Sequence, residues 1–225
     1  MGFFNRLANT VYPAKCIFCR QIMNDDAGLH ICSTCYEKLP FMTEAFLDTA
    51  QNKGTGYCDG VMSIFHYTGI VKESLIRFKF QNKPGYYRTY ARLIAGRLAG
   101  MSDITQYDMV LSVPLHRKRE LSRGYNQALL ISRFIGRELK IPERSKFLKR
   151  LKQTEAQSLL DGQKRHENVQ GAFIVTAPEK VGGKSILLVD DIMTTGSTLE
   201  ECSRVLKQAG AAKIIALVVA TGRKQ

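Results

Sequence analysis

An apolar strand pattern, an acidic pair and a hydroxyl-rich turn follow one another between Ile186 and Thr198, and this order constrains the chain more than any other segment. Four consecutive apolar residues, Ile186–Val189, predict a strand that is buried on both faces. Asp190 and Asp191 follow, and consecutive strand side chains point to opposite sides, so the two carboxylates need not serve the same purpose. A pattern with one apolar helical face begins after the turn. The segment therefore predicts a buried strand with a charged end, joined to the start of a helix.

The turn offers several groups that bind phosphate. A helix N-terminus has free N–H groups and carries the positive end of the helix dipole. Gly196 lets the backbone approach a ligand closely. Hydroxyl groups add further donors, from Thr194, Thr195, Ser197 and Thr198. The acidic pair would accept hydrogen bonds from ribose hydroxyls or hold the shell of a divalent cation, so the segment predicts a site for a sugar phosphate.

Helix capping is the alternative interpretation, because Asp, Thr and Ser are ordinary residues at helix starts. For an isolated Asp-Asp or Thr-Gly-Ser, capping is the better explanation. The complete run Asp190–Thr198 reverses this preference, because it resembles the phosphoribosyl pyrophosphate motif of the type I phosphoribosyltransferases.

The net charge of +13 is concentrated in two parts of the chain. Residues 1–45 are balanced, with four basic and four acidic side chains. Residues 70–100 hold seven basic side chains and one acid, and residues 116–166 hold fourteen against five. Such a distribution favours a polyanionic partner, either nucleic acid or a small molecule that carries pyrophosphate. A solvated basic surface without a partner is the alternative.

Two C-x-x-C pairs, separated by twelve residues, predict a metal site near the N-terminus. The four cysteines are Cys16, Cys19, Cys32 and Cys35. Four thiolates complete a closed tetrahedral shell, so we expect a structural Zn²⁺. A redox dithiol is the alternative, but the βαβ pattern that surrounds such dithiols is missing, and no export signal favours disulfides. Cys58 and Cys202 lack a partner pattern and are expected to pack in the core.

The rest of the chain alternates strand and helix patterns. Strands are expected at 60–67, 109–113, 147–148, 172–175, 186–189 and 214–220, and helices at 70–80, 88–98 and 126–139. This alternation predicts an α/β domain with a mainly parallel sheet flanked by helices. We assign residues 46–225 to this domain and residues 1–45 to the cysteine module. The long polar segment 150–171 is expected to be a mobile lid.

No segment is suited to a membrane. The longest purely apolar run, 214–220, is too short to cross a bilayer. The first residues lack the pattern of a secretory signal. We therefore expect a cytoplasmic protein without membrane insertion.

Together these motifs resemble the ComF family, the competence-associated phosphoribosyltransferase-like proteins, over nearly the whole chain. The resemblance rests on the two cysteine pairs, Val113–His116, Arg123–Gln127, Arg150, Thr154, Gln157, Arg165, Asn168–Phe173 and Asp190–Thr198. It implies a type I phosphoribosyltransferase fold behind a small zinc-binding module.

The resemblance also implies a loop that holds pyrophosphate. This loop would follow the strand that ends at Val113, and it points to His116, Arg117 and Arg119. Arg123, with its neighbour Asn126, would brace the loop or reach the ligand.

The remaining ligand contacts implied by the resemblance lie at the opening motif. Asp190 and Asp191 would meet the ribose hydroxyls, and Thr194–Thr198 would hold the 5′-phosphate. Mg²⁺ would arrive with the pyrophosphate, in keeping with its preference for phosphate oxygens and water. The segment 150–168 would close over the ligand.

Three functions are compatible with the sequence. The first is a competence protein for DNA uptake and natural transformation, which binds phosphoribosyl pyrophosphate and single-stranded DNA and works beside the ComFA helicase. The second is an active phosphoribosyltransferase, for which no acceptor pocket is evident. The third is a zinc-bearing adaptor with a vestigial nucleotide site. The basic segments favour the first function.

Aromatic side chains lie among the cations of residues 70–100, where Lys72 and Lys79 give the first expected helix a basic face. The aromatic residues are Phe78, Phe80, Tyr86, Tyr87 and Tyr90. Grooves that follow single-stranded DNA combine such residues with Lys and Arg. Core packing explains the same aromatic set equally well.

Overall fold

The structure is a computed structural model that describes residues 13–23, 28–43, 46–47, 56–99, 106–152 and 168–222. Its centre is a five-stranded sheet with the strand order β1-β2-β7-β6-β3. The strands are β1 (Phe46–Leu47), β2 (Gly60–His66), β3 (Met109–Ser112), β6 (Ser185–Met193) and β7 (Lys213–Thr221). All neighbours run parallel except β1, which pairs with β2 in the antiparallel direction. The predicted mainly parallel α/β fold is confirmed.

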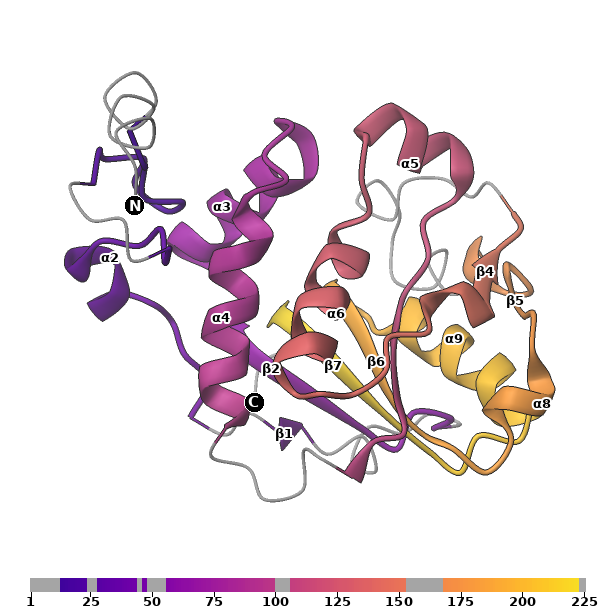
Figure 1. Ribbon diagram of the computed structural model, residues 1–225. Coiled ribbons are helices and arrows are strands. Elements are labelled where there is room, and N and C mark those ends of the chain that lie inside the picture. The colour runs from indigo at the N-terminus through magenta and orange to yellow at the C-terminus, as the bar shows by residue number, and fades with distance from the viewer. Residues whose placement is uncertain are drawn as a thin grey trace, which may run out of the picture.

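Helices cover both faces of this sheet (Figure 1). On one face lie α3 (Gly69–Phe80), α4 (Tyr86–Leu98) and α6 (Gln127–Glu138), and on the other lie α8 (Pro178–Val181) and α9 (Ser197–Gln208). Strand alternation divides the core accordingly: Leu187 and Val189 pack on the α3–α4–α6 side, and Ile186 and Leu188 pack on the α9 side.

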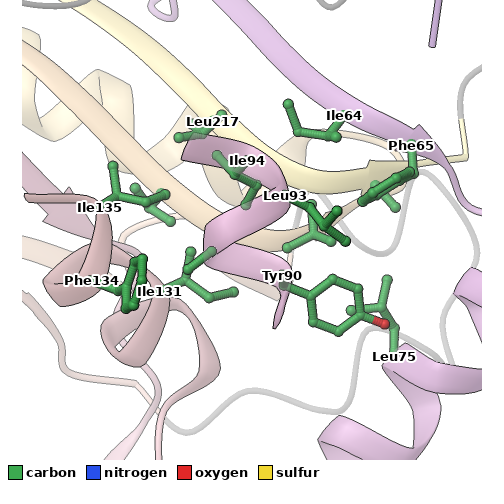
Figure 2. Packing of buried hydrophobic residues seen from close by; sticks show 14 of the residues in the cluster. Ile64, Phe65, Leu75, Tyr90, Leu93, Ile94, Ile131, Phe134, Ile135 and Leu217 are labelled. Atoms are coloured by element: carbon green, nitrogen blue, oxygen red, sulfur yellow. The ribbon is translucent and has the colours of Figure 1, made fainter. Parts of the chain in front are cut away.

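Figure 2 shows how the first of these clusters is filled. Tyr90 and Ile94 of α4 lie between Leu75 of α3, Ile131 of α6 and Leu217 of β7. Each of these side chains is buried, so α4 is held on both flanks and underneath. The helix pair α3–α4 is therefore fixed on the sheet by ordinary apolar packing.

The strand that carries the acidic pair is longer than expected. The sequence predicted that it ends in the acidic pair, but β6 continues to Met193. β3 pairs with β6 only as far as Val189, because Pro114 follows and has no N–H for another ladder bond. The last four residues of β6 are therefore open on the β3 side, and Asp190, Ile192 and Met193 pair with β7.

Two other segments refine the sequence expectations. The strands expected near 147–148 and 172–175 are β4 (Leu148–Arg150) and β5 (Phe173–Val175), which form a separate antiparallel ribbon beside η2 (Ser145–Phe147). The basic segment after β3 contains an unexpected short helix, α5 (Arg117–Arg123). Most of the expected lid, including Thr154, Gln157 and Arg165, lies outside the described residues.

The cysteine pairs pack directly on α3 and α4. In the second pair, Cys32 is the N-cap of the short helix α2 (Ser33–Glu37) and Cys35 lies within it. Buried Ile17 and Phe18 belong to the same apolar cluster as the α3–α4 pair. The guanidinium of Arg77 on α3 donates to the carbonyl oxygens of Ile17, at 3.1 Å, and Phe18, at 2.6 Å. The boundary between residues 45 and 46 stays a prediction, but the parts on either side of it share one core.

No helix in the described ranges is long and apolar enough to cross a membrane.

Candidate phosphate-binding cleft

A cleft of about 1000 Å³ opens where the parallel strands end. Both α3 and α5, which are labelled in the upper part of Figure 1, contribute residues to its lining. Its floor includes Asp190, Asp191 and Ile192, in the part of β6 that extends beyond β3. Parallel α/β sheets place ligands at this position, beyond the carboxyl ends of their strands.

The two carboxylates of the acidic pair face different surroundings, as strand alternation predicted. Asp191 is buried on the α3 side, where its Oδ1 lies 2.9 Å from the Nζ atom of Lys79. Asp190 is half-buried on the α9 side, where it interacts electrostatically with Arg150 and Cys202. Its Oδ1 accepts the backbone N–H of Asp191 at 2.8 Å.

Asp190 has an unusual acidity for a carboxyl group. Burial and the neighbouring negative charge of Asp191 raise its pKa to about 7, although Lys79, the Asp191 N–H and Arg150 act in the opposite direction. The raised pKa favours the protonated form of Asp190 more than that of an ordinary aspartate. A ligand hydroxyl that donates to this oxygen, or a cation beside it, would favour the charged form.

The turn after β6 does not follow the capping interpretation. The N-cap residue of α9 is Gly196, which has a left-handed backbone with φ of 87° and provides no side-chain cap. The Thr195 hydroxyl accepts the Ser197 N–H at 3.4 Å, whereas the acidic pair lies within the strand. Thr194 and Thr198 line the cleft. The Thr195 hydroxyl thus makes a local bond within the turn, and capping explains neither carboxylate.

Some residues of the predicted pyrophosphate loop line the cleft, and others hold the loop in place. Arg119 and Arg123 line the cleft. His116 instead caps α5, where its Nδ1 accepts the Lys118 N–H at 3.3 Å, and Arg117 lines a neighbouring groove of about 560 Å³. Asn126 braces the loop, because its Nδ2 donates to the Val113 carbonyl at 3.0 Å.

Sequence reasoning did not assign α3 to this site. Lys72 and Lys79 line the cleft, together with Phe80 at the end of the helix. A spacing of seven residues places both lysines on one helical face, and this was the available signal. Arg150 also lines the cleft from β4, and burial followed by the nearby charge of Arg119 lowers its pKa.

The four N-terminal cysteines form a metal-binding set. Their Sγ atoms all lie within 4.8 Å of one another, and those of Cys19 and Cys32 are 3.7 Å apart. Four sulfurs bound tetrahedrally to Zn²⁺ at about 2.3 Å stand roughly 3.8 Å apart, so the set fits zinc. A shell of four thiolates leaves no open position, which is typical of a structural ion. Cys58 and Cys202 are buried in the core, as expected.

Known protein families match both the cysteine module and the α/β domain of the chain. Residues 124–225 match the phosphoribosyl transferase domain, and residues 7–47 match the double zinc ribbon domain. Competence protein F of Haemophilus influenzae is 30% identical over 222 residues, which are 95% of this chain and 96% of that protein.

The chain belongs to the ComF family.

Two further relatives extend the comparison. Competence protein ComFC of Bacillus subtilis is 29% identical over 203 residues, which cover 88% of this ComF chain and 79% of that protein. The DNA utilization protein YhgH of Escherichia coli K12 is 36% identical over 107 residues, 48% of this chain and 46% of its own. The type I phosphoribosyltransferase fold is therefore shown, and the double zinc ribbon match and the four-cysteine set together support a structural zinc.

Proposed function

We propose that this ComF chain acts in DNA uptake by binding phosphoribosyl pyrophosphate with Mg²⁺ in the cleft and single-stranded DNA beside it, in the cytoplasm. Its ComF relatives support the role in DNA uptake. In this proposal Asp190 and Asp191 hold the ribose hydroxyls, and Thr194, Thr195, Gly196, Ser197 and Thr198 hold the 5′-phosphate.

The balance of charge in the cleft is the observation that carries the proposal. Among the described residues, two carboxylates and five cationic side chains line it; the cations are Lys72, Lys79, Arg119, Arg123 and Arg150. A ligand with several phosphates and free hydroxyls complements such a surface. We assign the pyrophosphate to Arg119 and Arg123. Both residues belong to α5, which begins at Arg117 and has His116 as its N-cap.

Mg²⁺ would be held mainly by the ligand. Carboxylate oxygens suit this ion, but Asp191 already accepts the ammonium group of Lys79. Phosphate oxygens and water would therefore complete most of its octahedral shell. The bound ion would neutralise part of the pyrophosphate charge.

Calorimetric titration with phosphoribosyl pyrophosphate and Mg²⁺ tests this site. The double variant Asp190→Asn/Asp191→Asn should bind at least about tenfold more weakly, because it loses the charged acceptors for the ribose hydroxyls. Asp108→Asn is the matched control, since Asp108 pairs with Lys184 away from the cleft. Equal affinity of the wild-type and double-variant proteins would refute the assignment.

The DNA part of the proposal has a separate test. Neutralising DNA phosphates with Lys and Arg releases counterions, so affinity for single-stranded DNA should fall steeply as salt rises. A salt-independent affinity would rule out a basic binding groove. Pull-down with a ComFA helicase would examine the proposed partner, and loss of capture after a charge-reversal substitution on the chain would map the contact.

Transfer catalysis is the second candidate function, and the pKa of Asp190 favours it. A carboxyl group that titrates near 7 within a ligand cleft is suited to accept a proton from an acceptor molecule. Transfer would displace pyrophosphate through a cation-like transition state, from which the cleft must exclude water. Pyrophosphate release that depends on an added acceptor would establish the enzyme, whereas tight binding without release would favour a binding role.

A further inference from the structure

One large aromatic side chain in the cleft is not used by the core. Phe80, the last residue of α3, is 66% exposed and belongs to neither hydrophobic cluster. Phe78 and Tyr90, from the same aromatic group, are fully buried. Core packing therefore explains these two aromatics but not the position of Phe80.

The surroundings of Phe80 suit a flat ligand. The guanidinium carbon of Arg123 lies 5.5 Å from the centroid of the Phe80 ring, and exposed Leu121 lines the same cleft. Asn82 also lines it, and its amide offers one acceptor and two donors to the edge of a ligand. An apolar face, a cation and an amide together resemble the contacts that nucleobases receive in single-strand binding sites.

The backbone on both sides of Phe80 is also held before any ligand arrives. The carbonyl oxygen of Phe78, two residues before Phe80, accepts hydrogen bonds from the Tyr125 hydroxyl and from the Gln127 amide, the latter at 3.2 Å. The N–H of Lys83 donates to the same Tyr125 hydroxyl at 3.1 Å. These bonds connect the end of α3 to the start of α6. The backbone there is ordered before binding, which lowers the entropic cost of binding a ligand.

We propose that Phe80 is a stacking platform for a nucleobase, which gives the cleft a base-binding subsite beside its phosphate-binding groups. The inference deepens the proposed function and rests on it for the neighbouring ligand. The base belongs to single-stranded DNA or to a free nucleobase or nucleotide; both sources present the same flat heteroaromatic ring. Stacking on an aromatic residue contributes about 1–3 kcal/mol per base, which is about 5-fold to 150-fold in affinity.

The absence of tryptophan from the sequence allows a direct test. Phe80→Trp creates a single tryptophan at the platform, and its emission can be excited apart from that of the nine tyrosines. We expect its emission to be quenched by an oligodeoxynucleotide or by free nucleotides, but not by an abasic oligonucleotide of equal length and charge. Tyr36→Trp is the matched control, because Tyr36 is 49% exposed and lies outside the residues that line the cleft. Its emission should not respond to any of these ligands.

The affinity measurements complete the test. Phe80→Ala should weaken binding of the base-bearing oligonucleotide about tenfold and leave the weaker binding of the abasic one unchanged. Quenching by oligonucleotide alone assigns the base to DNA, and quenching by free nucleotide assigns it to a small molecule. Equal quenching by the abasic strand, or no quenching by any ligand, would overturn the platform. Phosphoribosyl pyrophosphate is titrated separately on the wild-type chain, so failure there is distinguishable from failure at Phe80.

Discussion

The ammonium group of Lys79 lies 2.9 Å from Oδ1 of Asp191, and this ion pair joins α3 to the end of β6. The side chains are 23% and 8% exposed, so both partners are largely withdrawn from water. The pair therefore fixes a basic helix wall against the acidic floor of the cleft. It also contributes one of the positive charges that restrain the pKa of Asp190.

Lys79→Met should destabilise the protein by about 1–3 kcal/mol, because it leaves the buried Asp191 carboxylate without its cation. The double variant Lys79→Met/Asp191→Asn should recover most of that loss, since it removes the unpaired charge. Urea unfolding at a pH of about 8 measures both effects. Lys72→Met, an exposed lysine of the same helix face, serves as control and should change stability little. Additive effects of the two substitutions in the pair would contradict the coupling.

The pKa of Asp190 predicts a dependence of stability on pH. Its folded-state value of about 7 exceeds the value of about 3.9 for an unfolded Asp, so the folded protein binds the extra proton between these limits. This contribution is fully present below about pH 4 and is lost as the pH rises through about 7. Asp190→Asn should remove the loss, so its stability relative to the wild type should increase between about pH 5 and about pH 8. A constant difference between the two unfolding midpoints would show that Asp190 has an ordinary pKa.

Arg77→Ala should loosen the cysteine module. The substitution removes two charge-assisted bonds to the Ile17 and Phe18 carbonyls, at a cost of roughly 2–4 kcal/mol. We expect a lower melting temperature and faster zinc loss to a chelator, followed with a metallochromic indicator. Arg88→Ala, on the exposed side of α4, is the control. Zinc release at the wild-type rate would mean that Arg77 does not secure the module.

Two helical glycines should respond to alanine in opposite directions. A Cβ atom at Gly96 of α4 would meet no heavy atom of the described residues within 4 Å, so Gly96→Ala should stabilise the protein by about 0.5–1 kcal/mol. At Gly136 of α6, the same atom would lie 2.8 Å from the carbonyl oxygen of Ile141. Gly136→Ala should therefore destabilise by about 1–3 kcal/mol. Thermal unfolding of both variants checks the signs, and equal shifts would contradict the packing around Gly136.

The long elements with a buried apolar face were predictable from the sequence, and the short helix α5, which buries no residue, was not. β6 and β7 have near-continuous apolar runs because both of their faces are covered. In contrast, α5 has no buried residue and therefore leaves no apolar period in the sequence. Its ends are set by local groups, with the His116 side chain as N-cap and the left-handed Gly124 as C-cap.

The site was predictable where its residues are adjacent in sequence and hidden where the fold brings them together. The residues of the run Asp190–Thr198 are consecutive in the sequence, so a sugar-phosphate site could be predicted from them. The approach of Lys79 to Asp191 depends on how α3 packs, and the exposure of Asp190 depends on the length of β3. Pro114 signals where β3 ends, but only the strand order shows that its neighbour is β6.

Two residues of α3 that are two positions apart contact different parts of the molecule, the cysteine module and the cleft. Arg77 holds the carbonyls of the first cysteine pair, and Lys79 holds Asp191 in the cleft. A shortened chain that begins at residue 46 would thus uncover the apolar surface that Ile17 and Phe18 protect, and would release the helix that carries one wall of the cleft. Ligand affinities measured on such a truncated chain would therefore be those of a disturbed cleft. Chimeras between relatives should exchange the cysteine module together with α3 and α4.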